Sequence, residues 1–257
     1  MFDVKLKWLG CACFEMDFGG LRIVSDPWIG NNEKTDLTYE AVEKCDYITL
    51  SHGHHDHIMD IPALVEKFAP CLLCGEGTAM PLMQWANSNP MKVYPMTPNL
   101  ELDLDKVKVQ ALFGRHTPIA GTAQERNDFW AGHRLCGKDP LLQQLAIWGD
   151  LEYRNFLFTT PEGKKILLWG NTISRPEERN VLRQIQPDIA IMQLTGANRP
   201  EDMAAFCKEM GCKVVIPHHI DYPKDYMHLV EGLGESLAKI APEIQYIVPE
   251  YGKWISL

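Results

Sequence analysis

The chain has 257 residues, of which 46% are hydrophobic and 23% charged, so we expect one large domain with a sizeable core. Its formal net charge of -9 argues against non-specific nucleic-acid binding, which requires clustered lysine and arginine. No apolar stretch is long enough for membrane insertion, and residues 1–5 lack the pattern of a signal peptide, so the cytoplasm is the expected compartment. Oligomeric state leaves no signature in the sequence.

The first half of the chain is predicted to begin with strands and to continue with alternating strands and helices. Strands are predicted at residues 5–10, 13–18, 21–25, 47–50, 71–74, 91–95, 99–104 and 107–113. A loop with a short helix is expected at 29–45, and helices at 61–68 and 77–85, the first with Asp60 as its N-cap. Asp26, before Pro27, either caps a turn or supports a binding loop, and its own sequence context favours neither role.

The eight cysteines are expected to be buried thiols rather than ligands. Cys71 and Cys74 form a Cys-x-x-Cys pair, but it lies in an apolar run and has no second pair at zinc-ribbon spacing. Cys11 and Cys13 follow the first strand and could approach a site there, yet a packing role is the preferred interpretation.

A histidine loop, Ser51-His52-Gly53-His54-His55-Asp56-His57, separates the strand at 47–50 from the helix at 61–68. Imidazole is the commonest metal ligand in proteins, and an aspartate adds a charged oxygen ligand. In this spacing His52 and His54 can reach one metal ion, while Asp56 and His57 reach a second and His55 points the other way. The full pattern after an apolar strand predicts metal binding.

Residues 118–150 interrupt the alternation of strands and helices, although a helix is predicted at 140–148. Connections of this length in compact domains tend to be lids or binding loops. We expect a lid over the metal site, in which Arg126, His133 and Arg134 contact an anionic substrate. A packed insertion with solvated charges is an equally good interpretation.

The remainder of the chain returns to regular alternation. Strands are predicted at 153–160, 164–169, 189–192, 213–216 and 244–248, and helices at 176–186, 200–210 and 224–240. Pro161-Glu162-Gly163 predicts a hairpin between the first two of these strands. With no linker or low-complexity segment, the order indicates an α/β domain with two β-rich halves between helices.

Several motifs together resemble, in order, those of the metallo-β-lactamase superfamily. They are Trp8-Leu9-Gly10, Asp26-Pro27, the histidine loop, His116 after a strand, Gly170-Asn171-Thr172, and Val215-Ile216-Pro217-His218-His219. The resemblance implies a four-layer αβ/βα sandwich over residues 1–257, with 118–150 as a lid insertion. It also implies hydrolysis at one or two ions, Zn²⁺ or Mn²⁺.

The same resemblance implies a ligand set. His52, His54 and His116 would hold the first ion, and Asp56, His57 and a late histidine the second. His219 is the preferred late ligand, because the family pattern places it two residues after the proline; His218 is the alternative, or a hydrogen-bond donor behind the ligands. Asp26 would brace the histidine loop. Asp56 would also orient or deprotonate the water that a bound metal activates.

The chain departs from the family at Asn171, where the resemblance implies an aspartate that bridges the two ions. An amide oxygen can coordinate but carries no charge, which predicts a weaker second site. The protein could hold one ion tightly, keep two with Asn171 as a weak ligand, or have lost hydrolysis. We expect a working enzyme with lowered occupancy of the second site.

Within the superfamily the motifs look most like the ascorbate-6-phosphate lactonase-like hydrolases, and they are also similar to the N-acyl-phosphatidylethanolamine phospholipase D group. The first implies a lactone or phosphorylated sugar acid as substrate, and the second a phosphodiester. The expectation is a metal-dependent hydrolase of a small anionic lactone, ester or phosphodiester. The alternative is a catalytically impaired metal-binding or ligand-sensing protein, and the net charge disfavours a nuclease.

Overall fold

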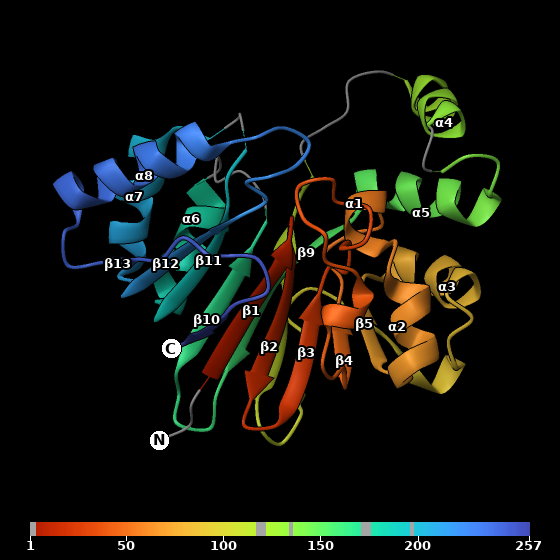
Figure 1. The fold of residues 1–257 in the computed structure, drawn as a ribbon, viewed down its shortest axis with the longest axis horizontal. Helices are drawn as coiled ribbons and strands as arrows, with labels where there is room; N and C mark the ends of the chain where they lie inside the picture. Colours follow the sequence, from red (N-terminus) through yellow and green to blue (C-terminus); the bar gives the residue numbers. More distant parts are fainter. Residues whose placement is uncertain (1–3, 117–121, 134–135, 171–175, 196–197) are drawn as a thin grey trace.

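The computed structural model describes residues 4–116, 122–133, 136–170, 176–195 and 198–257. Two seven-stranded sheets pack face to face, with helices on both outer surfaces (Figure 1). The strands are β1 Val4–Gly10, β2 Cys13–Phe18, β3 Leu21–Ser25, β4 Tyr47–Thr49, β5 Cys71–Cys74, β6 Val93–Pro95, β7 Glu101–Asp103, β8 Lys108–Gly114, β9 Tyr153–Thr159, β10 Lys165–Trp169, β11 Ile189–Gln193, β12 Val214–His218, β13 Gln245–Tyr246 and β14 Trp254–Ser256. The α-helices are α1 His55–Ile58, α2 Ile61–Phe68, α3 Glu76–Trp85, α4 Ala123–Gly132, α5 Pro140–Leu151, α6 Pro176–Ile185, α7 Pro200–Met210 and α8 Met227–Ile240.

Each sheet combines antiparallel and parallel strands. The first has the order β14-β1-β2-β3-β4-β5-β6 and the second β13-β12-β11-β10-β9-β8-β7. In the first, β1 and β3 are both antiparallel to β2, and β4 is parallel to β3. The carboxyl ends of β1, β3 and β4 therefore lie at the same end of the sheet. In the second, β8 and β10 are both antiparallel to β9, and β11 and β12 continue parallel to β10. The carboxyl ends of β8, β10, β11 and β12 therefore gather at one end of the second sheet.

Apolar side chains fill the space between the sheets and beneath both helical layers. Phe18 on β2 stacks on Phe158 on β9 with ring centroids 5.7 Å apart, which joins the two sheets. One buried cluster continues outward to α6, α7 and α8. A second lies on the outer face of the first sheet, where Leu64, Leu82 and Leu145 bring α2, α3 and α5 against β3, β4 and β5. This layered burial is the sandwich that the sequence predicted.

The structure departs from the sequence prediction in several places, one of which is the histidine loop, whose second half forms the short helix α1. Asp60 stands at the N-cap of α2 but makes no capping hydrogen bond, because its carboxylate instead accepts from the backbone N–H groups of Ile29 (2.5 Å) and Gly30 (3.2 Å). Residues Ala123–Gly132 form a helix that was not predicted, and its apolar residues do not follow a helical period. Strand β14, also unpredicted, pairs with β1 at a short exposed edge. No helix among the described residues combines the length and apolar character that crossing a bilayer requires.

Candidate metal centre

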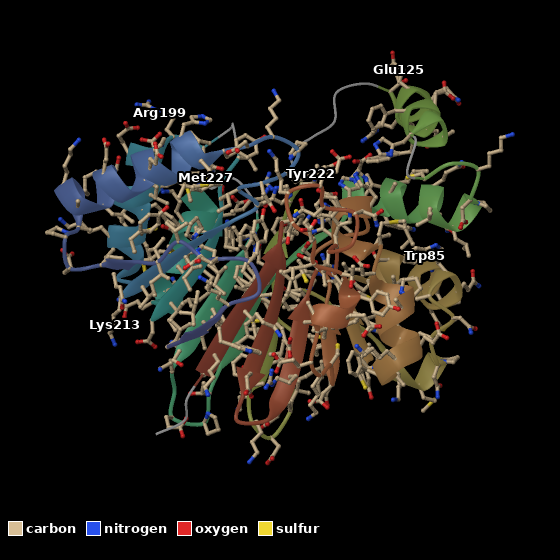
Figure 2. The ribbon with its side chains drawn as sticks, viewed as in Figure 1. Trp85, Glu125, Arg199, Lys213, Tyr222 and Met227 are labelled. Atoms are coloured by element: carbon tan, nitrogen blue, oxygen red, sulfur yellow. The ribbon has the colours of Figure 1, made fainter. Side chains whose placement is uncertain are left out.

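Five strand ends deliver polar side chains to one end of the sandwich. Cys11 follows β1, Asp26 follows β3 and the histidine loop follows β4, all in the first sheet. His116 follows β8, and His219 follows β12, in the second. Figure 2 shows the labelled Tyr222, which comes three residues after His219, at this end of the sheets.

The first cluster is made by three histidines. One ring nitrogen from each of His52, His54 and His116 lies within 4.8 Å of the others. His52 Nε2 and His54 Nδ1 are 3.1 Å apart, and the ring of His116 lies 4.5 Å from that of His54. Ligand atoms about 2.0–2.1 Å from a tetrahedral ion are themselves about 3.4 Å apart, so the separation of the two nitrogens fits a shared ion.

The outer ring nitrogens of His52 and His54 have partners that leave the inner ones for a ligand. His54 Nε2–H donates to Asp150 Oδ1 at 3.0 Å, so Nδ1 is the nitrogen left facing the site. His52 Nδ1 pairs with Ser51 Oγ at 2.9 Å. Burial and the neighbouring histidines lower the pKa of His52 well below its ordinary value, which keeps this ring neutral.

The second cluster contains Asp56, His57 and His219, together with Cys11. One ligand atom from each of these four buried groups lies within 4.8 Å of the others. Asp56 Oδ2 is 3.6 Å from His57 Nε2 and 3.4 Å from His219 Nε2, again the separations of ligands around one ion. The rings of His52 and His57 are 4.1 Å apart, so the two clusters adjoin.

Hydrogen bonds to Nδ1 orient both histidines of the second cluster. His57 Nδ1 lies 3.2 Å from Asp26 Oδ2, and His219 Nδ1–H donates to the backbone oxygen of Tyr222 at 2.7 Å. Asp26 also accepts from the backbone N–H of Ser51 through Oδ1 at 2.7 Å. Partners of this kind fix the tautomer of metal-binding imidazoles and direct Nε2 to the ion.

The charges of the second cluster oppose one another. Burial alone would raise the pKa of Asp56, but His57 and His219 hold it well below its ordinary value. Burial alone would lower the pKa of His57, but Asp56 and Asp26 raise it. Burial raises the pKa of Cys11, and the Asp56 and Asp221 carboxylates raise it further, so without a cation this thiol is neutral. Buried nitrogen, oxygen and sulfur donors held this close fit a divalent cation.

Other residues singled out in the sequence lie near the clusters without joining them. His218 donates from Nε2 to the backbone oxygen of Trp169 at 3.0 Å, so its ring belongs to the core beside the site. His55 Nε2 hydrogen-bonds to the Tyr222 hydroxyl at 2.9 Å, and the ring of His133 lies 4.6 Å from that of His55. Asn171 and Arg134 lie outside the described residues.

The segment between β8 and β9 contributes contacts that sequence reasoning missed. Asp150, in the last turn of α5, holds His54 through one carboxylate oxygen and accepts from Trp130 Nε1 on α4 through the other at 2.9 Å. Hydrogen bonds from His54 and Trp130 outweigh burial and lower the pKa of Asp150. The sequence offered no signal for this contact, because an aspartate late in an amphipathic helix is normally solvated.

Glycines allow α5 to approach the histidine loop closely. A Cβ atom added to Gly53 would lie 2.3 Å from the backbone oxygen of Leu145, and one added to Gly149 would lie 2.4 Å from His54 Cδ2. The backbone of α5 therefore packs directly on the loop that carries the ligands. The helices α4 and α5 lie together at the upper right of the fold, next to α1 (Figure 1).

Comparisons with known proteins show the family of the chain and the likeness of its fold. A family model described as a beta-lactamase superfamily domain matches residues 5–137. The chain is 26% identical over 250 residues to a UPF0173 metal-dependent hydrolase of Listeria innocua, covering 94% of this chain and 97% of the relative. It is 27% identical over 212 residues to a UPF0173 protein of Pyrococcus furiosus, covering 80% and 90%. Its fold is similar to that of Igni18, a metallo hydrolase of Ignicoccus hospitalis, with a TM-score of 0.72, 17% identity, and coverage of 99% and 98%.

Proposed function

Because the chain belongs to the metallo-β-lactamase superfamily and is a metal-dependent hydrolase, we propose that it cleaves a small, anionic lactone, ester or phosphodiester with a water molecule activated by Zn²⁺ or Mn²⁺. The observation that carries this proposal is the pair of adjoining ligand clusters. Three histidine nitrogens form one, and Asp56, His57 and His219 belong to the other. When bound, the metal would lower the pKa of water and offset negative charge on the reacting oxygen.

The chain's own residues would prepare the reaction in three ways. Asp150 and Ser51 keep the inner nitrogens of His54 and His52 directed at the first ion. Asp26 and the backbone of Tyr222 do the same for the second cluster. His52, His54, Asp56, His57 and His219 are almost fully buried and His116 is partly exposed, so the reacting groups would lie in a site that is largely shielded from bulk water.

Asp56 would orient the attacking water. Its pKa is held well below the ordinary value, so the side chain is a carboxylate at neutral pH and can accept a hydrogen bond from that water. A lowered pKa also makes it a weak base. Of the two roles expected from sequence, orientation is therefore the one that its surroundings favour.

The helices α4 and α5 would act as the lid over this site. His133 lies against His55, and Trp130 lies 4.7 Å from His54, so the C-terminal half of α4 reaches the histidine loop. Arg126, one turn earlier on α4, is half-buried and lines a small cavity together with Asp150. The positive charge of Arg126 at this cavity supports the proposal that the substrate is anionic.

Two further assignments belong to the same proposal. We assign the chain to the ascorbate-6-phosphate lactonase-like branch, supported by the opening Trp-Leu-Gly strand and the Asp26-Pro27 motif. We place the activity in the cytoplasm, supported by eight cysteines that are all free thiols, as in a reducing compartment.

The test is a screen of lactone, carboxylic ester and phosphodiester substrates with added Zn²⁺ or Mn²⁺. The parent protein should hydrolyse one class, and His54→Ala should abolish that activity because it removes a ligand of the first ion. The matched control is His228→Ala, which removes an exposed histidine on α8 and should leave the rate unchanged. Metal-loaded protein that is inactive on all three classes would contradict the proposal.

A non-catalytic metal-binding or ligand-sensing protein is the second candidate, and Asn171 is the observation that favours it. Metal content measured beside an Asn171→Asp variant separates the two. One ion and no activity in the parent, with two ions and activity in the variant, would support a sensor that has lost the bridging charge. Activity in the parent would support the enzyme.

A further inference from the structure

Cys11 packs with Ala12 and Trp28 in a small buried cluster, and its side chain also lies beside the candidate metal centre. It forms the turn between β1 and β2, and its side chain is fully buried. Its Sγ atom is one of four ligand atoms, with those of Asp56, His57 and His219, that lie within 4.8 Å of one another. The thiol therefore faces the second cluster of the candidate metal centre.

The backbone of Cys11 is tied to the strand end that carries His219. The Cys11 N–H donates to both carboxylate oxygens of Asp221, at 3.1 and 3.2 Å. The Cys11 carbonyl accepts from the His219 N–H at 2.9 Å and from Trp8 Nε1 at 3.0 Å. Asn32 Nδ2 holds the same Asp221 carboxylate at 2.6 Å. These hydrogen bonds fix the Cys11 sulfur and the His219 imidazole, which come from different sheets, in position relative to each other.

The donor set gains what a divalent ion needs when the sulfur is included. An imidazole that binds a metal is neutral, so Asp56, His57 and His219 together would provide one negative charge, and a thiolate would provide the second. Four protein donors complete a tetrahedral shell, whereas the three histidines of the first cluster leave a position for water. A thiolate also favours thiophilic metals over Mn²⁺, which prefers oxygen.

We propose that Cys11 is a thiolate ligand of the second metal ion and that this site selects Zn²⁺, or Co²⁺ as its probe, over Mn²⁺. The inference rests on the proposed metal-dependent function. As the ion binds, the S–H bond breaks, the proton passes to the buffer and the sulfur electron pair forms the bond to the metal. The added charge counters the weaker second site that Asn171 predicts.

Cys13 provides a matched comparison two residues along the chain. It is as fully buried as Cys11, but it packs with Leu9, Val24 and Ile48 in the cluster under α2 and α3. If only Cys11 affects metal binding, the effect cannot be due to burial of the thiol, because both thiols are equally buried.

The experiment is a titration of chelator-stripped protein with Co²⁺ under anaerobic conditions, followed by absorption. The parent should develop a near-ultraviolet sulfur-to-cobalt charge-transfer band as the second equivalent binds. Cys11→Ser and Cys11→Ala should lose the band and bind the second ion at least about tenfold more weakly, whereas Cys13→Ala should keep both. Mn²⁺ should compete poorly for the second equivalent.

The outcomes separate this inference from the proposed function. Two bound Co²⁺ ions without the band, or a band that persists in Cys11→Ala, would overturn the cysteine ligand and leave a metal hydrolase. Failure to bind Co²⁺ at all would overturn both. X-ray absorption of the Zn²⁺-loaded parent needs no variant, so it decides the question even if the variants do not fold: a sulfur neighbour at about 2.3 Å supports the inference, and its absence refutes it.

Discussion

Asp150 is the contact through which α4 and α5, the proposed lid, should control the affinity of the proposed site for its first metal ion. Its carboxylate accepts two hydrogen bonds, from His54 Nε2 at 3.0 Å and from Trp130 Nε1 at 2.9 Å, and its side chain is 3% exposed. In Asp150→Asn the amide offers one oxygen that can accept and one NH₂ group that can only donate, whereas both of its partners are N–H donors. If its oxygen faces His54, its NH₂ group faces the Trp130 N–H. If it flips, it donates to His54 Nε2 and moves the ring proton to Nδ1, the nitrogen that faces the metal site.

Either orientation should weaken the first site. Loss of such a partner behind a metal-binding histidine typically costs 10- to 100-fold in metal affinity, which corresponds to about 1.4–2.8 kcal/mol. The substitution also leaves one buried donor unsatisfied, at about 1–3 kcal/mol of stability. We therefore expect a lower affinity for the first ion together with a lower melting temperature.

The assay is a Zn²⁺ titration of stripped protein against a competing chromophoric chelator. The control is Asp139→Asn, which removes the carboxylate that caps the N-terminus of the same helix by accepting from Leu141 N at 2.9 Å. Asparagine caps as well as aspartate, so only the charge at the helix N-terminus is lost; stability should fall by about 0.3–1 kcal/mol, and metal affinity should be unchanged. A first-site affinity in Asp150→Asn equal to that of the parent would refute the reasoning.

A second substitution sharpens the test. Trp130→Phe removes the competing N–H, so in the double variant Asp150→Asn/Trp130→Phe the amide oxygen is free to accept from His54. Metal affinity in the double variant should recover relative to Asp150→Asn, although the smaller ring leaves a void. If the losses of metal affinity in the two single variants simply add in the double variant, then His54 and Trp130 do not both donate to the Asp150 carboxylate.

Three further outcomes are expected. Gly53→Ala should destabilise the fold by about 1–3 kcal/mol in chemical denaturation, because its Cβ would lie 2.3 Å from the backbone oxygen of Leu145; Gly132→Ala, which meets no atom within 4 Å, is the neutral control. Asp221→Asn should lower the free energy of unfolding by about 1–3 kcal/mol and weaken binding of a second metal equivalent, because one amide oxygen cannot accept from both the Cys11 N–H and Asn32 Nδ2 as the carboxylate does. Unchanged binding of the second equivalent would contradict the role of Asp221 in positioning Cys11. At a free metal concentration of 100 times the dissociation constant, bound metal stabilises the fold by about 2.7 kcal/mol. Removing it with a chelator should therefore lower the melting temperature, measured by calorimetry, by about 5–10 °C.

Local patterns in the sequence determined much of the fold. Apolar alternation located the strands β1 to β3, and Pro161-Glu162-Gly163 located the hairpin between β9 and β10. These signals are readable because strand pairing and turns depend on residues close in the chain. β14 escaped prediction because a short, half-exposed edge strand has little alternation, and α4 escaped because its stability depends on contacts such as that of Trp130 with Asp150.

The histidine loop was predicted to bind metal from spacing within seven residues, and the structure brings its ligand atoms into two clusters. His116 and His219 were placed there by resemblance alone, and the fold separates His219 from His218 by turning the latter toward the Trp169 carbonyl. β12 ends at His218, and His219 has a positive φ of 59°, so the chain turns between the two residues and their side chains diverge.

The sequence by itself predicted a candidate metal-binding loop after a buried strand of an α/β domain, because that information lies in contiguous residues. Only the tertiary structure decided what surrounds the loop. Asp150 meets His54 across 96 positions, and Asp221 meets Cys11 across 210. Neither aspartate nor the cysteine belongs to a local pattern, and each acquires its role because separate strand ends and a helix C-terminus converge at one end of the sandwich.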